Sequence, residues 1–159
     1  MAAVHVKTTR AQDDSSMFAG RGGGNLKVAY GSYTIGTALE INSTIDFCHI
    51  PNGATIVGGM LNGSDLDTGT EALEFDVGTR TKGTAYDDTS ADPDALLNSG
   101  VLSGDAIAEH VPQGGICVHL KLAAPITLTK DTTVFGTFTA AAAATGTGTI
   151  WVRVDYLMP

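Results

Sequence analysis

The chain has 159 residues, of which 43% are hydrophobic and 16% charged, and its formal net charge at pH 7 is −8. This size and composition favour one domain with a sizeable core rather than two domains. An acidic chain, with an isoelectric point of about 4.7, repels a phosphate backbone, so nucleic acid is not an expected partner. No apolar run reaches the roughly 18 residues of a membrane span, and the N-terminus lacks a signal-peptide core. We therefore expect no membrane contact and synthesis in the cytoplasm.

The N-terminal leader differs in charge from the rest of the chain. Residues 1–30 contain four basic and two acidic residues, a net charge of +2; because the whole chain has −8, residues 31–159 carry −10. A leader with few apolar residues cannot bury enough surface to fold alone. We expect residues 1–24 to form an extended arm that becomes ordered only on another surface, and the alternative is an inert terminus.

The glycine cluster "GRGGGN" at residues 20–25 raises the question of a phosphate-binding loop. Such a loop needs Gly-Lys-Ser/Thr between a strand and a helix. The triplet is missing here, and the residues that follow alternate as a strand does. Because glycine adopts positive φ without strain, we interpret the cluster as a hinge between the arm and a domain spanning residues 25–159.

The remainder of the chain is patterned as short strands separated by turn residues. Alternating polar and apolar residues predict half-buried strands over 25–35 and 39–47, a turn at 51–53, and a strand over 54–61. Further strands are expected in "EALEFDVG", "GICVHLKLAAPITL", "TTVFGTFTA" and "GTIWVRVDYLM". About eight strands at roughly ten-residue spacing predict an all-β fold, an antiparallel β-sandwich or barrel, with a jelly roll of two four-stranded sheets as the first choice.

The last strand has a distinctive parity. Its residues Ile150, Val152, Val154 and Tyr156 share one face, whereas Trp151 lies with Arg153 and Asp155 on the other. The tryptophan is therefore expected off the apolar face, either at a subunit contact or in a sugar-binding site.

Residues 79–110 form a long connection that departs from the strand pattern. Asp92 is suited to cap a helix, Pro93 to begin it, and Asn98-Ser99-Gly100 to end it, so we predict a short helix over 92–97. The connection is rich in aspartate but lacks the order of an EF-hand loop, which favours acidic surface loops without a metal. The alternative is a cation site, from which a metal-assisted hydrolase could be built.

Four soft side chains could be considered as zinc ligands: Cys48, His49, Cys117 and His119. Cys117 and His119 share a face of their strand, but Cys48 and His49 are neighbours and point to opposite faces. A tetrahedral site from these four is strained, and neither pair has the spacing of a zinc ribbon. We therefore predict no metal site.

Catalytic motifs are missing from the sequence. It contains no Gly-x-Ser-x-Gly elbow, no His-Glu-x-x-His pair and no Cys-x-x-Cys. The sequence therefore predicts a protein that is not an enzyme, with no catalytic residue and no cofactor.

The order of several motifs resembles a known family. "IPNGATIVGGML", "GTEALEFDVGTR", "ADPDALLNSGVL" and the closing "GTGTIWVRVDYL" resemble small virion structural proteins of tailed bacteriophages, of the head decoration or cement type. The resemblance covers about residues 45–157. It implies a β-sandwich subunit, commonly a homotrimer, that binds the major capsid protein on the outer surface of the virion after synthesis in the host bacterial cytoplasm.

Charge is compatible with that placement, and one alternative stays open. An acidic body suits a solvent-facing surface, and a basic arm suits docking on a shell. The alternative is a carbohydrate- or receptor-binding jelly roll of a phage tail or fibre, in which exposed aromatic residues would stack on a sugar.

Overall fold

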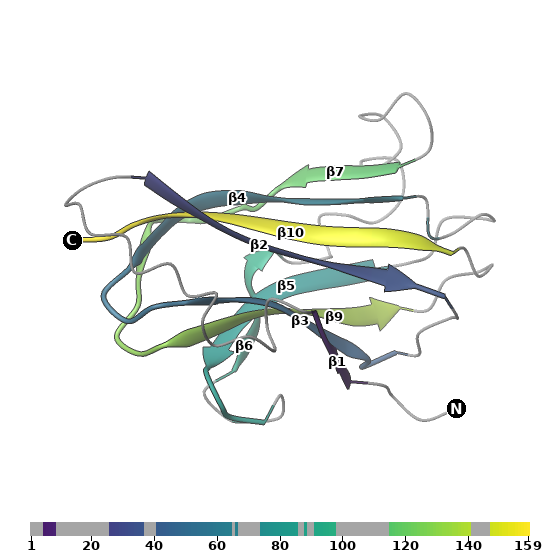
Figure 1. The fold of residues 1–159 in the computed structure, drawn as a ribbon, viewed down its shortest axis with the longest axis horizontal. Coiled ribbons are helices and arrows are strands. Elements are labelled where there is room, and N and C mark those ends of the chain that lie inside the picture. Colours follow the sequence, from purple (N-terminus) through teal and green to yellow (C-terminus); the bar gives the residue numbers. More distant parts are fainter. Residues whose placement is uncertain are drawn as a thin grey trace.

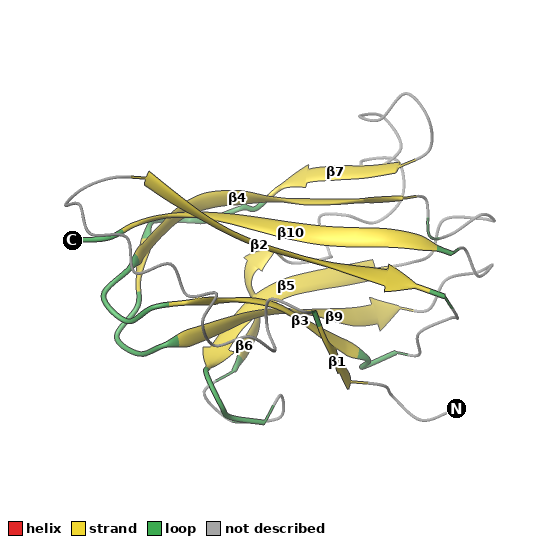
Figure 2. Cartoon of the chain, in the orientation of Figure 1, coloured by secondary structure: helices red, strands yellow, loops and turns green. Residues whose placement is uncertain are grey.

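The protein is described by a computed structural model, and every element among the described residues is a β-strand (Figure 2). The described residues are 5–8, 26–36, 41–64, 66, 74–85, 88, 91–97, 115–140 and 147–159. The strands are β1 (His5–Lys7), β2 (Leu26–Ile35), β3 (Thr44–Ile50), β4 (Thr55–Ser64), β5 (Glu74–Thr81), β6 (Asp92–Leu97), β7 (Gly115–His119), β8 (Ile126–Thr127), β9 (Thr132–Ala140) and β10 (Gly148–Leu157). No helix in this part of the chain is long and apolar enough to cross a membrane.

The strands form two sheets that face each other as the layers of a sandwich (Figure 1). Sheet A has the order β1-β3-β9-β5-β6, and sheet B has the order β2-β10-β4-β7 with β8 also paired to β4. The pairing of β1 with β3 is parallel, and the other pairs between described strands are antiparallel. The predicted all-β sandwich is confirmed.

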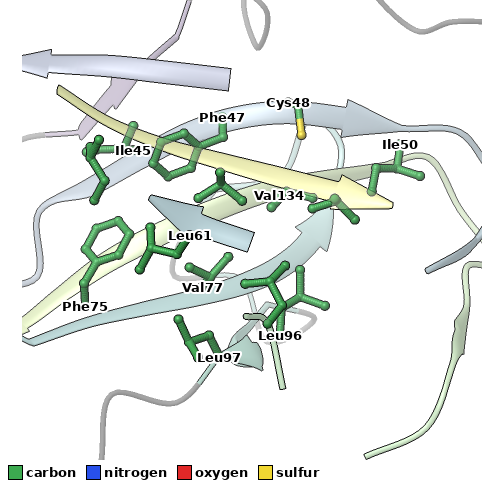
Figure 3. Close-up of a cluster of buried hydrophobic side chains, with 14 of the residues drawn as sticks. Ile45, Phe47, Cys48, Ile50, Leu61, Phe75, Val77, Leu96, Leu97 and Val134 are labelled. Atoms are coloured by element: carbon green, nitrogen blue, oxygen red, sulfur yellow. The ribbon is translucent and has the colours of Figure 1, made fainter. Parts of the chain in front are cut away.

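The core lies between the two sheets and is built from buried apolar residues of both sheets (Figure 3). On β10 the side chains of Ile150, Val152, Val154 and Tyr156 are buried, as their parity predicts. Phe75 of β5 packs edge-on against Phe138, with ring centroids 4.7 Å apart. Burial of this apolar surface supplies the main driving force that holds the two sheets together.

Strand β3 is buried along its whole length, and a bulge changes which of its residues face the core. The pairing register with β9 shifts between Asp46 and Cys48, so Phe47 and Cys48, although adjacent, both belong to the core cluster. The neighbours Asp46 and His49 are also buried and pair with polar side chains of other strands. A simple alternation along this strand could not have predicted that arrangement.

The predicted helix over residues 92–97 is wrong, because these residues form strand β6. This strand pairs with β5 at the edge of sheet A, and Leu96 and Leu97 are fully buried. The capping signals of Asp92 and Pro93 are local, whereas burial of two leucines against the sheet is worth more than one isolated helical turn. Pro93 is compatible with a strand here since an edge strand leaves one side without pairing partners.

The parity of β2 is set by one close approach between the sheets. A Cβ added to Gly31 would overlap the backbone carbonyl of Phe47 on β3. Moving β2 by one residue would bring Tyr30 or Ser32 to this contact, and neither side chain would fit. Gly31 therefore faces inward, and the apolar residues Leu26, Val28 and Tyr30 face outward.

The described part of the leader contacts the domain. Residues 5–7 add a parallel strand to the edge of β3, Val6 packs against the core, and Thr8 is buried. Most of the arm and the boundary between residues 24 and 25 lie outside the described residues, so the hinge stays a prediction.

Substitution of Gly31 tests the close approach of the two sheets. We expect Gly31→Ala to lower the free energy of unfolding by at least about 2 kcal/mol, because the added methyl group meets backbone atoms that cannot rotate away. Gly58→Ala on β4 is the matched control, since nothing lies within 4 Å of a Cβ there. Chemical denaturation measures both changes, and equal unfolding midpoints for the two variants would contradict the assigned packing.

Tyr156 should make the fold sensitive to alkali. Burial raises the pKa of its phenol above the ordinary value of 10.0, and the nearby Cys48 adds to the effect. The neutral Tyr156 phenol therefore contributes fully to the free energy of unfolding below pH 10. This contribution is lost as the pH rises further, because the phenol ionises at a lower pH in the unfolded chain than in the folded one. We expect Tyr156→Phe to flatten the fall of stability above pH 10. If the free energies of unfolding of the two proteins fell in parallel above pH 10, ionisation of this phenol would have no effect on stability.

Candidate functional site

The outer face of sheet B presents a row of exposed apolar residues. Leu26, Val28 and Tyr30 of β2 are 60%, 44% and 47% exposed, and Trp151 of the adjacent β10 is 36% exposed. We call these four residues the β2–β10 stripe. Single exposed apolar residues are common on proteins, but a contiguous group marks a binding surface.

The register between the two strands places the stripe residues beside one another. Trp151 is opposite Ser32, and Arg153 is opposite Tyr30, so Trp151 and Tyr30 are diagonal neighbours on one face. Diagonal neighbours in a sheet lie about 7–8 Å apart, within reach of two aromatic rings. The prediction that Trp151 lies off the apolar face is confirmed, whereas the outward position of the β2 residues was not predicted.

The polar part of this face carries no net charge. The Arg153 guanidinium donates to the Asp155 carboxylate, with Nη2 and Oδ2 3.1 Å apart, and both side chains are partly exposed. Trp, Tyr and Arg are the residue types that contribute most to binding in protein interfaces. Since residues 31–159 carry −10 overall, this neutral face repels a second acidic surface less than a net-negative face would.

Strand β2 is also an edge strand within the described part of the molecule. Its partner is β10 on one side, and no described strand pairs with its other side (Figure 1). An edge strand of ten residues with apolar side chains is prone to associate with other chains unless another surface covers it. The edge and the stripe are therefore parts of one candidate interaction surface.

A second candidate feature is a buried ion pair beneath β1. Asp46 of β3 and Arg80 of β5 are both more than nine-tenths buried, with Oδ2 and Nη2 2.5 Å apart. Arg80 also donates to the carbonyl of Thr84 and lies over the ring of Phe135. A buried carboxylate requires such a partner because an uncompensated charge in the interior is strongly destabilising.

The leader strand closes over this ion pair. Lys7 places Nζ 3.9 Å from the Asp46 carboxylate, and the Nδ1 atom of His5 lies 2.8 Å from the hydroxyl of Thr44. A pocket of about 230 Å³ remains between β1 and the Arg80–Thr84 segment. The carboxylate in this pocket is already held by a guanidinium, so the arrangement serves to seat β1 rather than to provide a general base.

The four zinc candidates are not assembled into one site in the described structure. Cys48 belongs to the core, and the Nδ1 atom of His49 lies 3.0 Å from the Thr133 hydroxyl in sheet A. His119 is exposed on β7 of sheet B, while the side chain of Cys117 lies outside the described part. Within the described ranges no group of three or more His, Cys, Asp or Glu side chains could hold a metal ion.

Most of the acidic connection lies outside the described residues. Two of its aspartates, Asp92 and Asp94, are exposed on β6. Partial burial raises the pKa of Asp92, and the hydrogen bond and charge of Asp94 raise it further. Two neighbouring carboxylates that repel each other do not by themselves form a cation site.

Comparison with known proteins relates this fold to phage capsids. The chain is similar to one in the capsid of Ralstonia phage GP4, with a TM-score of 0.74, 18% identity, and 98% of this chain and 99% of that chain covered. A chain of the cyanophage Pam1 capsid asymmetric unit has a TM-score of 0.65 and 24% identity, with 88% and 90% covered. A chain of the acid-stable capsid of the Helicobacter pylori bacteriophage KHP30 has a TM-score of 0.55 and 18% identity, with 84% and 88% covered. At these identities the likeness establishes the fold.

No protein-family model matches the chain, and its sequence matches no curated protein.

Proposed function

We propose that this chain is a non-enzymatic virion structural protein that binds the outer surface of a phage capsid as a decoration or cement subunit. The observation that carries the proposal is the fold shared with a chain of the Ralstonia phage GP4 capsid over nearly the full length of both chains. The motif order noted in the sequence independently resembles the decoration type. An acidic body is suited to the solvent side of a shell rather than to packaged DNA.

We also propose that the sandwich is a jelly roll. The antiparallel pairs are nested along the chain, with β2 to β10, β3 to β9, β4 to β7 and β5 to β6. Such nesting is that of one long hairpin, and the further pairs β10–β4 and β9–β5 would roll this hairpin into two sheets. This order supports a double Greek-key arrangement.

The β2–β10 stripe is the surface through which copies of the chain associate, as a homotrimer. Two acidic bodies repel each other, so a contact between copies is least costly where the surface is apolar and neutral. The stripe meets both conditions, since Arg153 and Asp155 compensate each other beside exposed aromatic rings. Association into trimers then strengthens capsid binding through avidity.

The competing function is a carbohydrate- or receptor-binding module of a tail or fibre. Trp151, Tyr30 and the Arg153–Asp155 pair could supply stacking and hydrogen bonds to a sugar. However, the aliphatic side chains of Leu26 and Val28 extend the stripe, which favours a protein contact. Specific binding on a glycan array would support the competing function.

The stripe can be tested by the double variant Tyr30→Ser/Trp151→Ser. We expect light scattering to show a trimer for the parent at micromolar concentration and a monomer for the variant, because the exposed rings contribute most of the contact. On particles stripped of this protein, the variant should bind at least tenfold less than the parent.

Two further variants make the test specific. Ile41→Ser is the matched control, since Ile41 is 46% exposed but lies in a turn outside the stripe, and it should behave as the parent does. Val28→Lys disrupts the stripe without removing the partly buried tryptophan, and it should also give monomers. A parent that is monomeric, or stripe variants with unchanged assembly and occupancy, would overturn the proposal.

A further inference from the structure

The edge of β3 forms a slot that receives a short strand from the leader. Residues 5–7 pair in parallel with residues 44–46, and beyond them the Thr8 amide donates to the Asp46 carbonyl at 2.8 Å. The Thr8 hydroxyl donates to the carbonyl of Phe47 at 2.5 Å, and Val6 packs against the core. The slot therefore recognises four successive residues by backbone and side-chain contacts.

The slot is held in shape by groups other than the leader. Strand β9 pairs with β3 on the opposite side over residues 44–50, and Arg80 of β5 fixes the Asp46 carboxylate. Lys7 contributes only a longer contact to the same carboxylate, and its side chain is more than half exposed. Because the slot is fixed by these groups, it can bind residues 5–8 from the same copy or from another copy of the chain.

The connection from β1 to β2 is longer than a path within one copy requires. Thr8 and Gly31 both lie at the Phe47 carbonyl, and Leu26 is five residues from Gly31 along β2. At about 3.3 Å per residue the chain must bridge roughly 20 Å between Thr8 and Leu26. Residues 9–25, when extended, span about 55 Å.

We propose that the leader strands are exchanged in the assembly, so that β1 of one copy occupies the β3 slot of a neighbouring copy. This inference rests on the homo-oligomer of the proposed function and names a second contact within it. The exchanged strand makes the same contacts as an internal one, so exchange costs no interaction and links the copies. The surplus length of residues 9–25 allows the strand to reach a neighbour, and the glycine-rich segment within it offers the turns that a changed direction requires.

Cysteine cross-linking between β1 and the slot tests the exchange. His5 is opposite Thr44, and their side chains are in contact, so His5→Cys and Thr44→Cys place two thiols side by side. The two single variants are purified separately, mixed, dissociated and reassembled, and then treated with a short bismaleimide. In this mixture each copy carries only one of the two introduced cysteines. A cross-link between the two introduced positions must therefore join two different copies.

The double variant and the parent protein serve as controls. The parent reports any reaction of the native cysteines, of which Cys48 is buried and should be inert. Exchange predicts covalent dimers in the mixture and covalent oligomers of the double variant on a denaturing gel. Monomers with internal cross-links, together with an unlinked mixture, would overturn the exchange. If the cross-linking excluded exchange but light scattering still showed a trimer, the proposed function would be retained and only the strand exchange would be rejected.

Discussion

The close approach of β2 and β3 at Gly31 is the constraint on which the outward-facing β2–β10 stripe depends. Because only a glycine fits against the Phe47 backbone, β2 has one allowed parity. That parity turns Leu26, Val28 and Tyr30 outward beside Trp151. The same Phe47 carbonyl accepts the hydrogen bond of Thr8, so the stripe and the leader slot lie near the same edge of the sandwich.

The parts of the fold that depend on one strand alone could be predicted from the sequence. The inward face of β10 and the position of Trp151 follow from unbroken alternation. Alternation on β2 predicts a half-buried strand but cannot say which side is buried when the opposing contact is a backbone carbonyl. The strand at residues 92–97 and the Asp46–Arg80 pair depend on partners distant in sequence, which local capping signals and motif spacing do not contain.

The proposed function assigns separate tasks to two kinds of surface on the molecule. In the proposed function, repulsion between the acidic bodies keeps free subunits apart in solution, and the neutral stripe is the surface where copies make contact. Strand β1 of the leader contacts the domain interior through Lys7, which lies near the buried Asp46–Arg80 pair. Among the described strands β1 pairs only with β3, and such an edge strand can open locally while the core stays folded, which makes exchange compatible with a stable sandwich.

Fluorescence of Trp151 can report directly whether the β2–β10 stripe is the contact between copies, since Trp151 is the single tryptophan of the chain. Acrylamide quenching can be measured across a dilution series in which light scattering follows the oligomer. We expect quenching to fall as trimers form, because the partly exposed indole becomes covered by a neighbouring copy. An oligomer in which Trp151 is quenched as readily as in the monomer would contradict the assignment of the stripe as the contact between copies.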